Sequence, residues 1–283
     1  MKQVYVKWAA AGAAALAGLV LLDAWVLEQY FFEVKTFDIG KKNSQRKLKL
    51  VHVSDLHFRQ TLWPFYQKLA RKINRLQPDL LLITGDLIDL SGRPGPLRRF
   101  FHRLHPSITK IAIPGNHDHL SDVSIGTLKK ILEQHNGHLL RNESRAFMVG
   151  DQRIMITGLD DFIESNASFK EAVKEVGREE HHLLLVHSPL QQEVVQKELE
   201  RINAARSSAR QLNIQYIFAG HNHGGQVRFF NHVPILPKKS GHYINGWYNN
   251  QPPYLYVSKG FGTSAIPFRF FARSEVTVFY YGF

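Results

Sequence analysis

Five short apolar runs in this chain each end directly in polar residues that a hydrophobic core does not need. The runs, each with the residues that follow it, are 48–53 with Asp55 and His57, 80–84 with Asp86 and Asp89, 108–113 with Asn116, His117 and Asp118, 182–186 with His187, and 214–219 with His221 and His223. Runs of this length that are rich in Val, Ile and Leu are typical of fully buried strands. The fold must therefore bury five strands and still leave a polar group at the end of each.

Helical patterns alternate with the first of these runs. Apolar residues recur at helical spacing in residues 64–77, 97–104 and 127–135. Strands that alternate with helices predict βαβ units and a largely parallel sheet. Because ligands gather beyond the carboxyl ends of the strands in such sheets, we expect the polar clusters to meet at one edge.

Shorter β-like runs follow in the second half of the chain. Residues 147–158 predict a hairpin, and 255–258 and 276–281 predict strands between turns rich in Gly and Pro. We expect these strands to help complete two packed sheets. The predicted fold is therefore α/β, a four-layer αββα sandwich over residues 47–283, and the chain of 283 residues is long enough for a substantial core.

The first 27 residues predict a membrane anchor. Lys2 and Lys7 lead into an apolar run over residues 8–22. With residues 24–27 the segment reaches the roughly 20 residues that a bilayer requires. A cleaved signal peptide and a buried core helix are alternatives, but the run lacks a good small-x-small cleavage site. We expect an uncleaved, single-pass transmembrane or signal-anchor helix, with the remainder of the chain outside the cytoplasm.

Residues 28–46 are interpreted as a basic linker between the anchor and the domain. Its basic run from Lys41 to Lys49 is either solvated or a juxtamembrane patch that binds anionic head groups. The formal charge of +12 favours anionic partners, such as phosphorylated substrates, an acidic membrane surface or nucleic acid. The sequence contains no cysteine, which excludes disulfides, zinc fingers and thiol catalysis. Nothing in it fixes an oligomeric state.

The strand-end residues include a set of oxygen and nitrogen ligands without sulfur. The members of this set are Asp55, His57, Asp86, Asn116, His187, His221 and His223. Such a mixture suits two divalent ions, Mn²⁺ before Fe or Zn²⁺, and is too rich in nitrogen for Ca²⁺ or Mg²⁺. Asp86 is the candidate for a carboxylate that bridges the ions. Two ions about 3.5–4 Å apart would clamp a phosphate and make a shared water acidic enough to attack phosphorus.

His117 lies outside this ligand set and is the candidate general acid, which would protonate the leaving oxygen. We expect the neighbouring Asp118 to orient its imidazole. Asp89 can be read either as part of the site or as a simple helix cap.

The order of these motifs resembles that of the calcineurin-like metallophosphoesterases. The motifs are Asp-x-His at 55–57, Gly-Asp-x-x-Asp at 85–89, Gly-Asn-His-Asp at 115–118, the single His187 and Gly-His-x-His at 220–223. The resemblance extends over residues 47–281 and implies an αββα sandwich with a dinuclear centre. It assigns one ion to Asp55, His57, Asp86 and His223, the other to Asp86, Asn116, His187 and His221, and the role of catalytic acid to His117.

A longer pattern resembles one branch of that family. Residues 220–226, 258–263 and 267–270 look like the branch of membrane-anchored or exported bacterial phosphoesterases that is associated with hydrolysis of the pyrophosphate of UDP-2,3-diacylglucosamine. Where that branch is expected to carry Ser-Arg-Gly, this chain has Ser-Lys-Gly, with Lys259 in the centre. Lysine keeps the charge but lacks the bidentate fork that grips a phosphate. We therefore assign no phosphate clamp to this position.

The sequence thus predicts a membrane-anchored, metal-dependent phosphoester hydrolase that acts on an anionic substrate such as a lipid-linked or nucleotide-linked pyrophosphate. A nuclease or a cyclic-nucleotide or general phosphodiesterase is the alternative, since the same metal centre serves those reactions and the positive charge suits nucleic acid. Against a nuclease, the sequence shows no basic helical face or stacking platform. A metal-free binding protein is a third interpretation, but none of the seven candidate ligands is lost.

Overall fold

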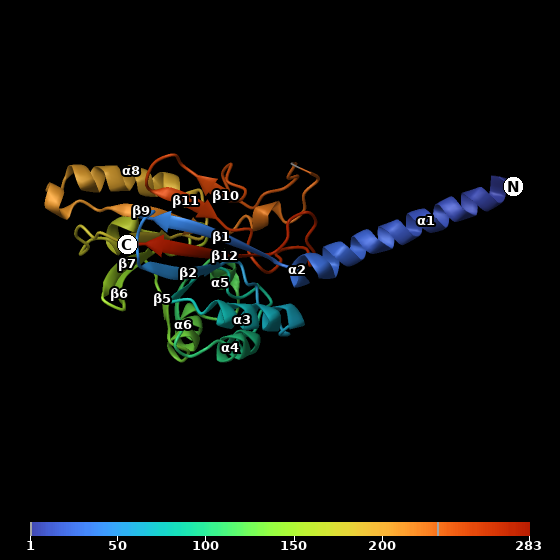
Figure 1. Cartoon of the computed structure of the whole chain (residues 1–283), viewed down its shortest axis with the longest axis horizontal. Helices are drawn as coiled ribbons and strands as arrows, with labels where there is room; N and C mark the ends of the chain where they lie inside the picture. Colours follow the sequence, from blue (N-terminus) through green and yellow to red (C-terminus); the bar gives the residue numbers. More distant parts are fainter. Residues whose placement is uncertain (1, 231) are drawn as a thin grey trace.

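The computed structural model describes residues 2–230 and 232–283, which contain two six-stranded sheets (Figure 1). The strands are β1 Glu33–Gly40, β2 Lys47–Val53, β3 Leu80–Thr84, β4 Thr109–Ile113, β5 Gly137–Leu139, β6 Glu143–Val149, β7 Gln152–Gly158, β8 His182–Leu185, β9 Ile214–Ala219, β10 Gly246–Tyr248, β11 Tyr254–Val257 and β12 Glu275–Gly282. The first sheet has the order β1-β12-β2-β3-β4-β5, and the second has the order β10-β11-β9-β8-β7-β6. Strands β2 to β5 are parallel, as are β7, β8, β9 and β11, and β6 and β7 form the predicted hairpin.

Helices cover the outer faces of both sheets. They are α3 Pro64–Leu76, α4 Pro94–His102, α6 Ile125–Glu133, α7 Phe169–Ala172 and α8 Gln191–Ala204. The short helix α5 Asn116–Leu120 and the 3-10 turns η2 Ser208–Arg210 and η3 His223–Gly225 lie in connections between strands. Leu69, Leu97 and Ile131 of α3, α4 and α6 share a core with the first sheet. Phe169 and Val195 of α7 and α8 share another core with the second sheet. A third core separates the two sheets, so the predicted αββα sandwich is confirmed.

Strand β2 shows how one strand serves two cores. Val51 and Val53 belong to the core beneath the helices, whereas Leu48 and Leu50 belong to the core between the sheets. Successive side chains of a strand point to opposite faces, so a strand that is covered on both faces, such as the wholly buried β3, is apolar at nearly every position. This double coverage explains why the sequence shows continuous apolar runs rather than alternation.

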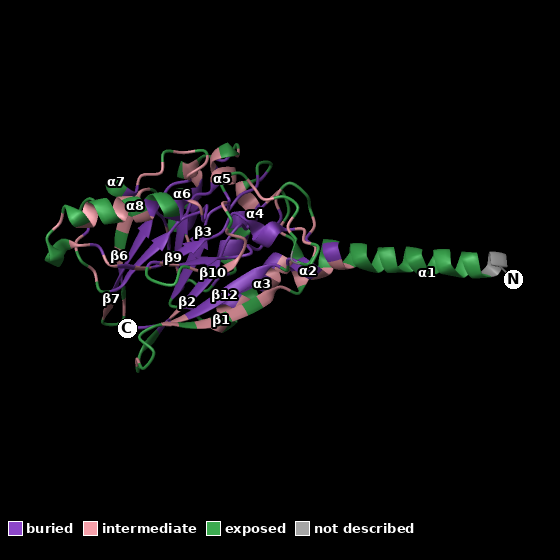
Figure 2. Ribbon diagram, turned by 90° about the horizontal axis from the view of Figure 1, so that it is seen from above, coloured by how far each residue is buried: buried purple, intermediate pink, exposed green. Residues whose placement is uncertain are grey.

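The N-terminal segment forms a helical element that projects from the domain (Figures 1 and 2). It consists of α1 Lys2–Leu22, a π-helical turn η1 Asp23–Leu27 and α2 Glu28–Tyr30. Residues 5–30 are long and apolar enough to cross a membrane, and the side chains of residues 5–22 are exposed. This helix could therefore anchor the protein in a membrane.

Hydrogen bonds fix the end of this helix to the domain. The carbonyl oxygen of Ala24 accepts a hydrogen bond from the backbone N–H of Arg269 at 3.0 Å. The buried carboxylate of Glu28 accepts one from the backbone N–H of Ala272 at 2.9 Å. The helix is therefore joined to the domain by direct contacts near its end.

Residues 33–40 correct the prediction that 28–46 is only a linker. They form the edge strand β1, which pairs in parallel with β12 along its whole length. Because β1 runs away from the helix, the basic run that begins at Lys41 lies at the opposite end of the domain (Figure 1). There Lys41 pairs with Glu180 at 3.2 Å. The basic run is therefore not beside the N-terminal helix, where a juxtamembrane patch would have to lie.

Candidate metal centre

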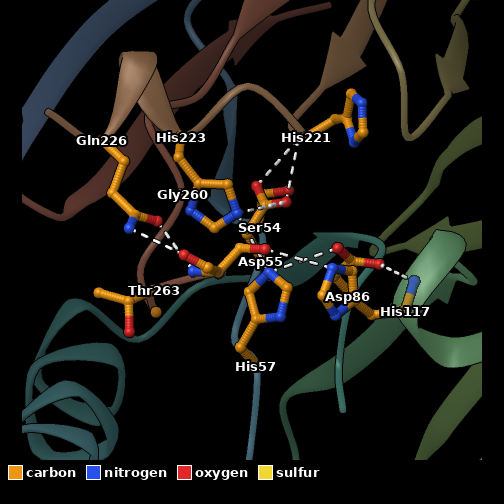
Figure 3. Close-up of polar contacts among 12 residues, drawn as sticks. Ser54, Asp55, His57, Asp86, His117, His221, His223, Gln226, Gly260 and Thr263 are labelled. Atoms are coloured by element: carbon orange, nitrogen blue, oxygen red, sulfur yellow. Dashed lines mark hydrogen bonds and ion pairs between the residues drawn. The ribbon is translucent and has the colours of Figure 1, made fainter. Parts of the chain in front are cut away.

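Polar residues that follow the carboxyl ends of β2, β3, β4 and β9 lie close together (Figure 3). His187, which follows β8, lies 3.4 Å from Asp86 of the same group. Backbone hydrogen bonds continue the pairing past the strands: the N–H of His57 donates to the carbonyl of Asp86 at 2.9 Å, and that of Gly220 donates to the carbonyl of His187 at 3.0 Å. This continued pairing holds the loops in register beyond the last strand residues. The polar clusters therefore converge, as the parallel arrangement predicts.

Five of the seven candidate ligands have a left-handed backbone. Their φ angles are 54° for Asp55, 46° for His57, 51° for Asp86, 72° for His221 and 49° for His223. Positive φ is uncommon for residues other than glycine, and such strained residues cluster at functional sites. Packing of a core would not require this geometry at the ends of three strands, β2, β3 and β9.

Gly220 shows why one of these motifs begins with glycine. A Cβ atom at this position would lie 1.7 Å from Ser54 Oγ and 2.6 Å from Asp55 Oδ2. Its absence lets the loop after β9 approach so closely that the N–H of His221 donates to both carboxylate oxygens of Asp55, at 3.0 and 3.1 Å. The glycine therefore allows the two sheets to meet at the site.

The first group of ligand atoms surrounds His57. Its Nε2 lies 3.1 Å from Nε2 of His223 and 3.3 Å from Oδ2 of Asp86. Nε2 of His223 in turn lies 3.7 Å from Oδ1 of Asp55. All four side chains are buried. The structure thus brings together the four residues predicted to hold one ion.

The second group lies on the other side of Asp86. Nε2 of His187 is 3.4 Å from Oδ1 of Asp86 and 3.1 Å from Oδ1 of Asn116. The ring of His221 is 4.9 Å from that of His187, and its Nε2 donates to the carbonyl of Lys238 at 2.8 Å. Asp86 therefore presents one carboxylate oxygen to each group.

The contacts of Nδ1 in His187 and His223 indicate how Nε2 of each ring is placed to bind a cation. Nδ1 of His187 donates to the carbonyl of Thr84 at 2.8 Å, which turns Nε2 toward Asp86 and Asn116, an orientation that is typical of histidine ligands. His223 differs, because Nη2 of Arg269 lies 3.2 Å from its Nδ1 and a guanidinium can only donate. The neutral His223 ring therefore carries its hydrogen on Nε2, and a cation would have to displace that proton.

The charges at the site are those of a cation-binding site. Burial raises the pKa of Asp55, and the charge of Asp86 raises it further. Burial also opposes ionisation of Asp86, but its contacts with His187 and the nearby His57 hold its pKa well below the usual value. Buried carboxylates need compensating positive charge.

The donor atoms fit divalent metal ions. Ligand atoms of Asp55, His57 and His223 lie within 4.8 Å of one another, and so do those of Asp55, Asp86 and His187. Oxygen and imidazole nitrogen together suit transition-metal ions. The chain therefore has clusters of side chains that can hold metal ions.

His117 lies at the edge of this cluster, where Nε2 is 3.2 Å from Oγ of Ser264. Gln226 positions this serine: its Nε2 donates to the carbonyls of Ser264 and Ile266, both at 2.9 Å, and its Oε1 accepts from the N–H of Ser264 at 2.8 Å. Gln226 and Ser264 were not among the predicted site residues. The glutamine that ends the 220–226 motif was the available signal.

Asp118 does not orient His117 as predicted. Its buried carboxylate instead accepts from the backbone N–H groups of Gly115, Leu87 and Ile88, at 2.9, 3.2 and 2.9 Å. These bonds join the loop after β4 to the loop after β3. Asp118 is therefore a residue that fixes the backbone on which the site is built.

Asp89 lies where the orienting carboxylate was expected. Its Oδ2 is 3.6 Å from Nδ1 of His57 and 4.0 Å from Nδ1 of His117, and it also approaches Nε of Arg59 at 3.5 Å. Burial opposes ionisation, but the contacts with His57 and Arg59 lower the pKa of Asp89 to about 2. Asp89 therefore lies behind two site imidazoles, and it does not cap α4, whose N-cap is Arg93.

Lys259 stands where arginine was expected in a Ser-Arg-Gly motif, and its ammonium group pairs with a residue outside the ligand cluster. Its Nζ pairs with Oε2 of Glu33 at 2.7 Å, and its stem packs where a Cβ of Gly224 would lie. The lysine therefore ties the edge strand β1 to the loop after β11.

Comparisons with known proteins agree with this geometry. The family model for calcineurin-like phosphoesterases matches residues 48–225. The chain is 28% identical to the uncharacterized metallophosphoesterase YkuE of Bacillus subtilis over 82% of this chain and 78% of that protein. It is 29% identical to the uncharacterized protein YpbG of the same organism over 86% of this chain and 84% of that protein.

A third relative is named as a transmembrane protein. The chain is 28% identical to a bovine transmembrane protein with a metallophosphoesterase domain, over 83% of this chain and 53% of that protein. The fold, the converging ligand clusters and the match over most of the domain lead to one conclusion: the chain is a phosphoesterase-type hydrolase that belongs to the calcineurin-like phosphoesterase family.

Proposed function

We propose that this protein is a membrane-anchored hydrolase in which two divalent ions act on the phosphoester or pyrophosphate bond of an anionic substrate. The observation that carries the proposal is the position of Asp86, whose two carboxylate oxygens face different groups of ligand atoms. One ion would be held by Asp55, His57, Asp86 and His223, and the other by Asp86, Asn116, His187 and His221. Mn²⁺ suits this set best, with Fe and Zn²⁺ as alternatives.

The bound ions would neutralise a phosphate and make a water acidic enough to act at neutral pH. His117 is the group of this chain that can complete the reaction, since its Nε2 faces outward from the cluster toward Ser264. Burial lowers the pKa of His117, while the charges of Asp86 and Asp89 act in the opposite direction and favour the protonated ring that a proton donor requires. The carboxylate of Asp89, 4.0 Å from Nδ1 of His117, would act on the ring through its charge, and Asp118 would keep the loop that carries His117 in place.

A pyrophosphate that joins a nucleotide to an acylated sugar, such as UDP-2,3-diacylglucosamine, is the substrate that we favour. Trp25 at the end of the membrane helix lines the same pocket as His57 of the site, which suits an amphiphilic anion. The net charge of +12 also supports an anionic substrate, and it equally supports the alternative of a nuclease.

The test is hydrolysis by the full-length protein in lipid nanodiscs with added Mn²⁺. Three substrates are compared: an aryl phosphodiester, UDP-2,3-diacylglucosamine and single-stranded DNA. We expect turnover of the first two, faster on the lipid-linked pyrophosphate, and none after removal of metal by a chelator. Asp122→Asn removes an exposed carboxylate and should retain this turnover. It is the control for variants that remove a carboxylate of the site.

Each outcome decides between the alternatives. Cleavage of DNA with affinity that falls steeply with salt would replace the proposed substrate by nucleic acid. Turnover of the aryl diester alone would retain the metal chemistry and reject the lipid-linked pyrophosphate. A failure to hydrolyse any of the three with metal bound would contradict the proposed substrate class.

We also propose that the catalytic domain lies outside the cytoplasm. The chain contains no cysteine, so Ser208→Cys at an exposed turn would carry the only thiol. We expect a membrane-impermeant maleimide to label this thiol in intact cells. Labelling only after the cells are broken would place the domain in the cytoplasm.

A further inference from the structure

A pocket of about 600 Å³ lies between the end of the membrane helix and the site. Trp25 and Val26 of the helix form one wall, and Trp63 and Phe65 at the start of α3 form another. His57 of the ligand cluster also lines the pocket. Figure 1 shows α2 and α3 side by side at the end of the domain from which the helix projects. The pocket therefore connects the membrane side of the molecule to the ligand cluster.

The lining of the pocket separates into an apolar part and a polar part that contains the guanidinium of Arg59. The walls from the helix and α3 are largely aromatic or aliphatic, while His57 and Arg59 lie at the end nearest the site. Nη2 of Arg59 donates to the carbonyl of Thr263 at 3.2 Å, which holds the guanidinium at this end. Among the described residues, none that lines the pocket is acidic. Such a lining matches a molecule with an apolar chain and an anionic head.

The helix wall is held in place by the same segment that supports the site. Ring centroids of Trp25 and Phe268 are 5.8 Å apart, and the next residue, Arg269, donates its N–H to Ala24. The Arg269 guanidinium is buried and donates to the carbonyl of His223 at 3.2 Å. The wall is therefore built into the domain, although it belongs to the segment that could cross the membrane.

We infer that this pocket binds the alkyl or acyl chain of the substrate, while its phosphate lies at the metal centre. The inference rests on the proposed phosphoester hydrolase and adds that the membrane helix itself supplies part of the substrate site. Trp25 and Val26 are then residues that determine specificity for substrates with an apolar chain. The length of that chain, rather than the head group alone, sets affinity.

Binding tests this without relying on turnover. Ethyl-, butyl-, hexyl- and octylphosphonate are titrated by calorimetry into the full-length protein in nanodiscs with Mn²⁺. Because these chains start in water, each methylene that enters the pocket should tighten binding by up to roughly fourfold. Equal affinity for the ethyl and octyl compounds would overturn the inference, as would no detectable binding of octylphosphonate.

Variants locate the chain. Val26→Trp should fill the pocket and weaken octylphosphonate by about tenfold or more while leaving ethylphosphonate unchanged. Trp25→Ala removes part of the pocket wall and should reduce the increase in binding affinity for each added methylene. Trp8→Ala is the matched control, since Trp8 is an exposed tryptophan of the same helix far from the pocket. An unchanged slope in both pocket variants would overturn the inference.

A second groove of about 440 Å³, lined in part by His223, provides a further check. Ile235 lines this groove and is highly exposed. If Ile235→Ala flattens the dependence on chain length and Trp25→Ala does not, the chain lies in that groove and the inference is wrong. Loss of hydrolysis with a retained gain per methylene would contradict the proposed function and leave the chain-binding pocket standing.

Discussion

Two kinds of buried histidine occupy this domain, and they differ in their neighbours rather than in their burial. His52 and His182 lie within strands, where Nε2 of each contacts a threonine Oγ1, that of Thr84 at 2.8 Å and that of Thr157 at 2.7 Å. Burial lowers the pKa of His52 to about 3 and that of His182 to about 4. By contrast, His57 lies past the end of its strand, beside Asp86. Burial alone therefore does not make a site; carboxylates at strand ends do.

The largest expected effect is the loss of turnover when Asp86 is changed, since this carboxylate distinguishes the site histidines from the core histidines. Asp86→Asn removes the charge that faces both ligand groups, and the several kcal/mol of transition-state stabilisation that two ions supply should be lost. We expect turnover to fall by about 10⁴-fold or more, which this energy loss implies. Metal content by mass spectrometry should fall in parallel. Full metal occupancy in the variant would contradict the bridging role.

A smaller effect is expected from a site histidine that is not a ligand. His117→Asn should slow turnover by about 10²–10⁴-fold, the usual contribution of a general acid, with metal content unchanged. The loss should be largest for an alkyl ester and smaller for a 4-nitrophenyl ester, whose leaving oxygen needs no proton. An equal loss on both esters would assign His117 a role other than proton donor.

Asp89→Asn tests whether the carboxylate behind the rings matters. We expect a loss of about 10- to 100-fold in activity or metal affinity, as for other residues that orient metal ligands. Because the pKa of Asp89 is about 2, the wild-type carboxylate stays ionised through neutral pH. The variant should therefore shift the pH profile of kcat/KM, which reflects the imidazoles. A loss of stability without any shift in this profile would indicate a structural role only.

The smallest effect should come from the core histidine and should concern stability alone. The pKa of His52 is about 3 in the folded protein, below its usual 6.5, so the unfolded chain binds a proton below pH 6.5 that the folded chain does not. Stability therefore falls as pH falls from about 6.5 toward 3. The double variant His52→Leu and Thr84→Val removes this contribution and both polar partners.

The double variant should change the pH dependence in a measurable way. Between pH 6 and pH 5 its free energy of unfolding should decrease by about 1 kcal/mol less than that of the wild type. Thermal unfolding of both proteins without metal at each pH measures this difference, and activity at pH 7 should be retained. Parallel pH curves for the two proteins would show that His52 does not titrate on unfolding.

The strands that carry the site could be predicted because they are buried on both faces. Such strands are apolar throughout, so the polar residues at their ends stand out in the sequence. The edge strand β1 could not be found this way. Its partly buried Glu33 and Lys35 pair with Lys259 at 2.7 Å and Glu275 at 2.7 Å, partners more than 200 positions away. When the partner of a charged residue is that distant in sequence, the residue pattern predicts a solvent-exposed linker instead of a strand.

The remaining differences arise from buried polar groups. Helix α8 was not predicted, since its inner face includes the buried Gln191 and Gln192 with Val195. Asp118 was placed beside His117 because the two are adjacent in sequence. Its actual partners are backbone N–H groups about 30 positions earlier and at Gly115, which no residue pattern reveals. Spacing identifies which residues meet, but hydrogen bonds to the backbone decide what each one does.

The direct attachment of Ala24 and Glu28 to the domain has a consequence for how the protein would meet its substrate. If the helix spans a bilayer, the site stays at a fixed height and orientation above the lipid surface. It would then search in two dimensions, by lateral diffusion, and sample molecules that share its membrane. A longer and looser connection would widen the reach of the site, whereas this one would restrict it to the layer immediately at the surface.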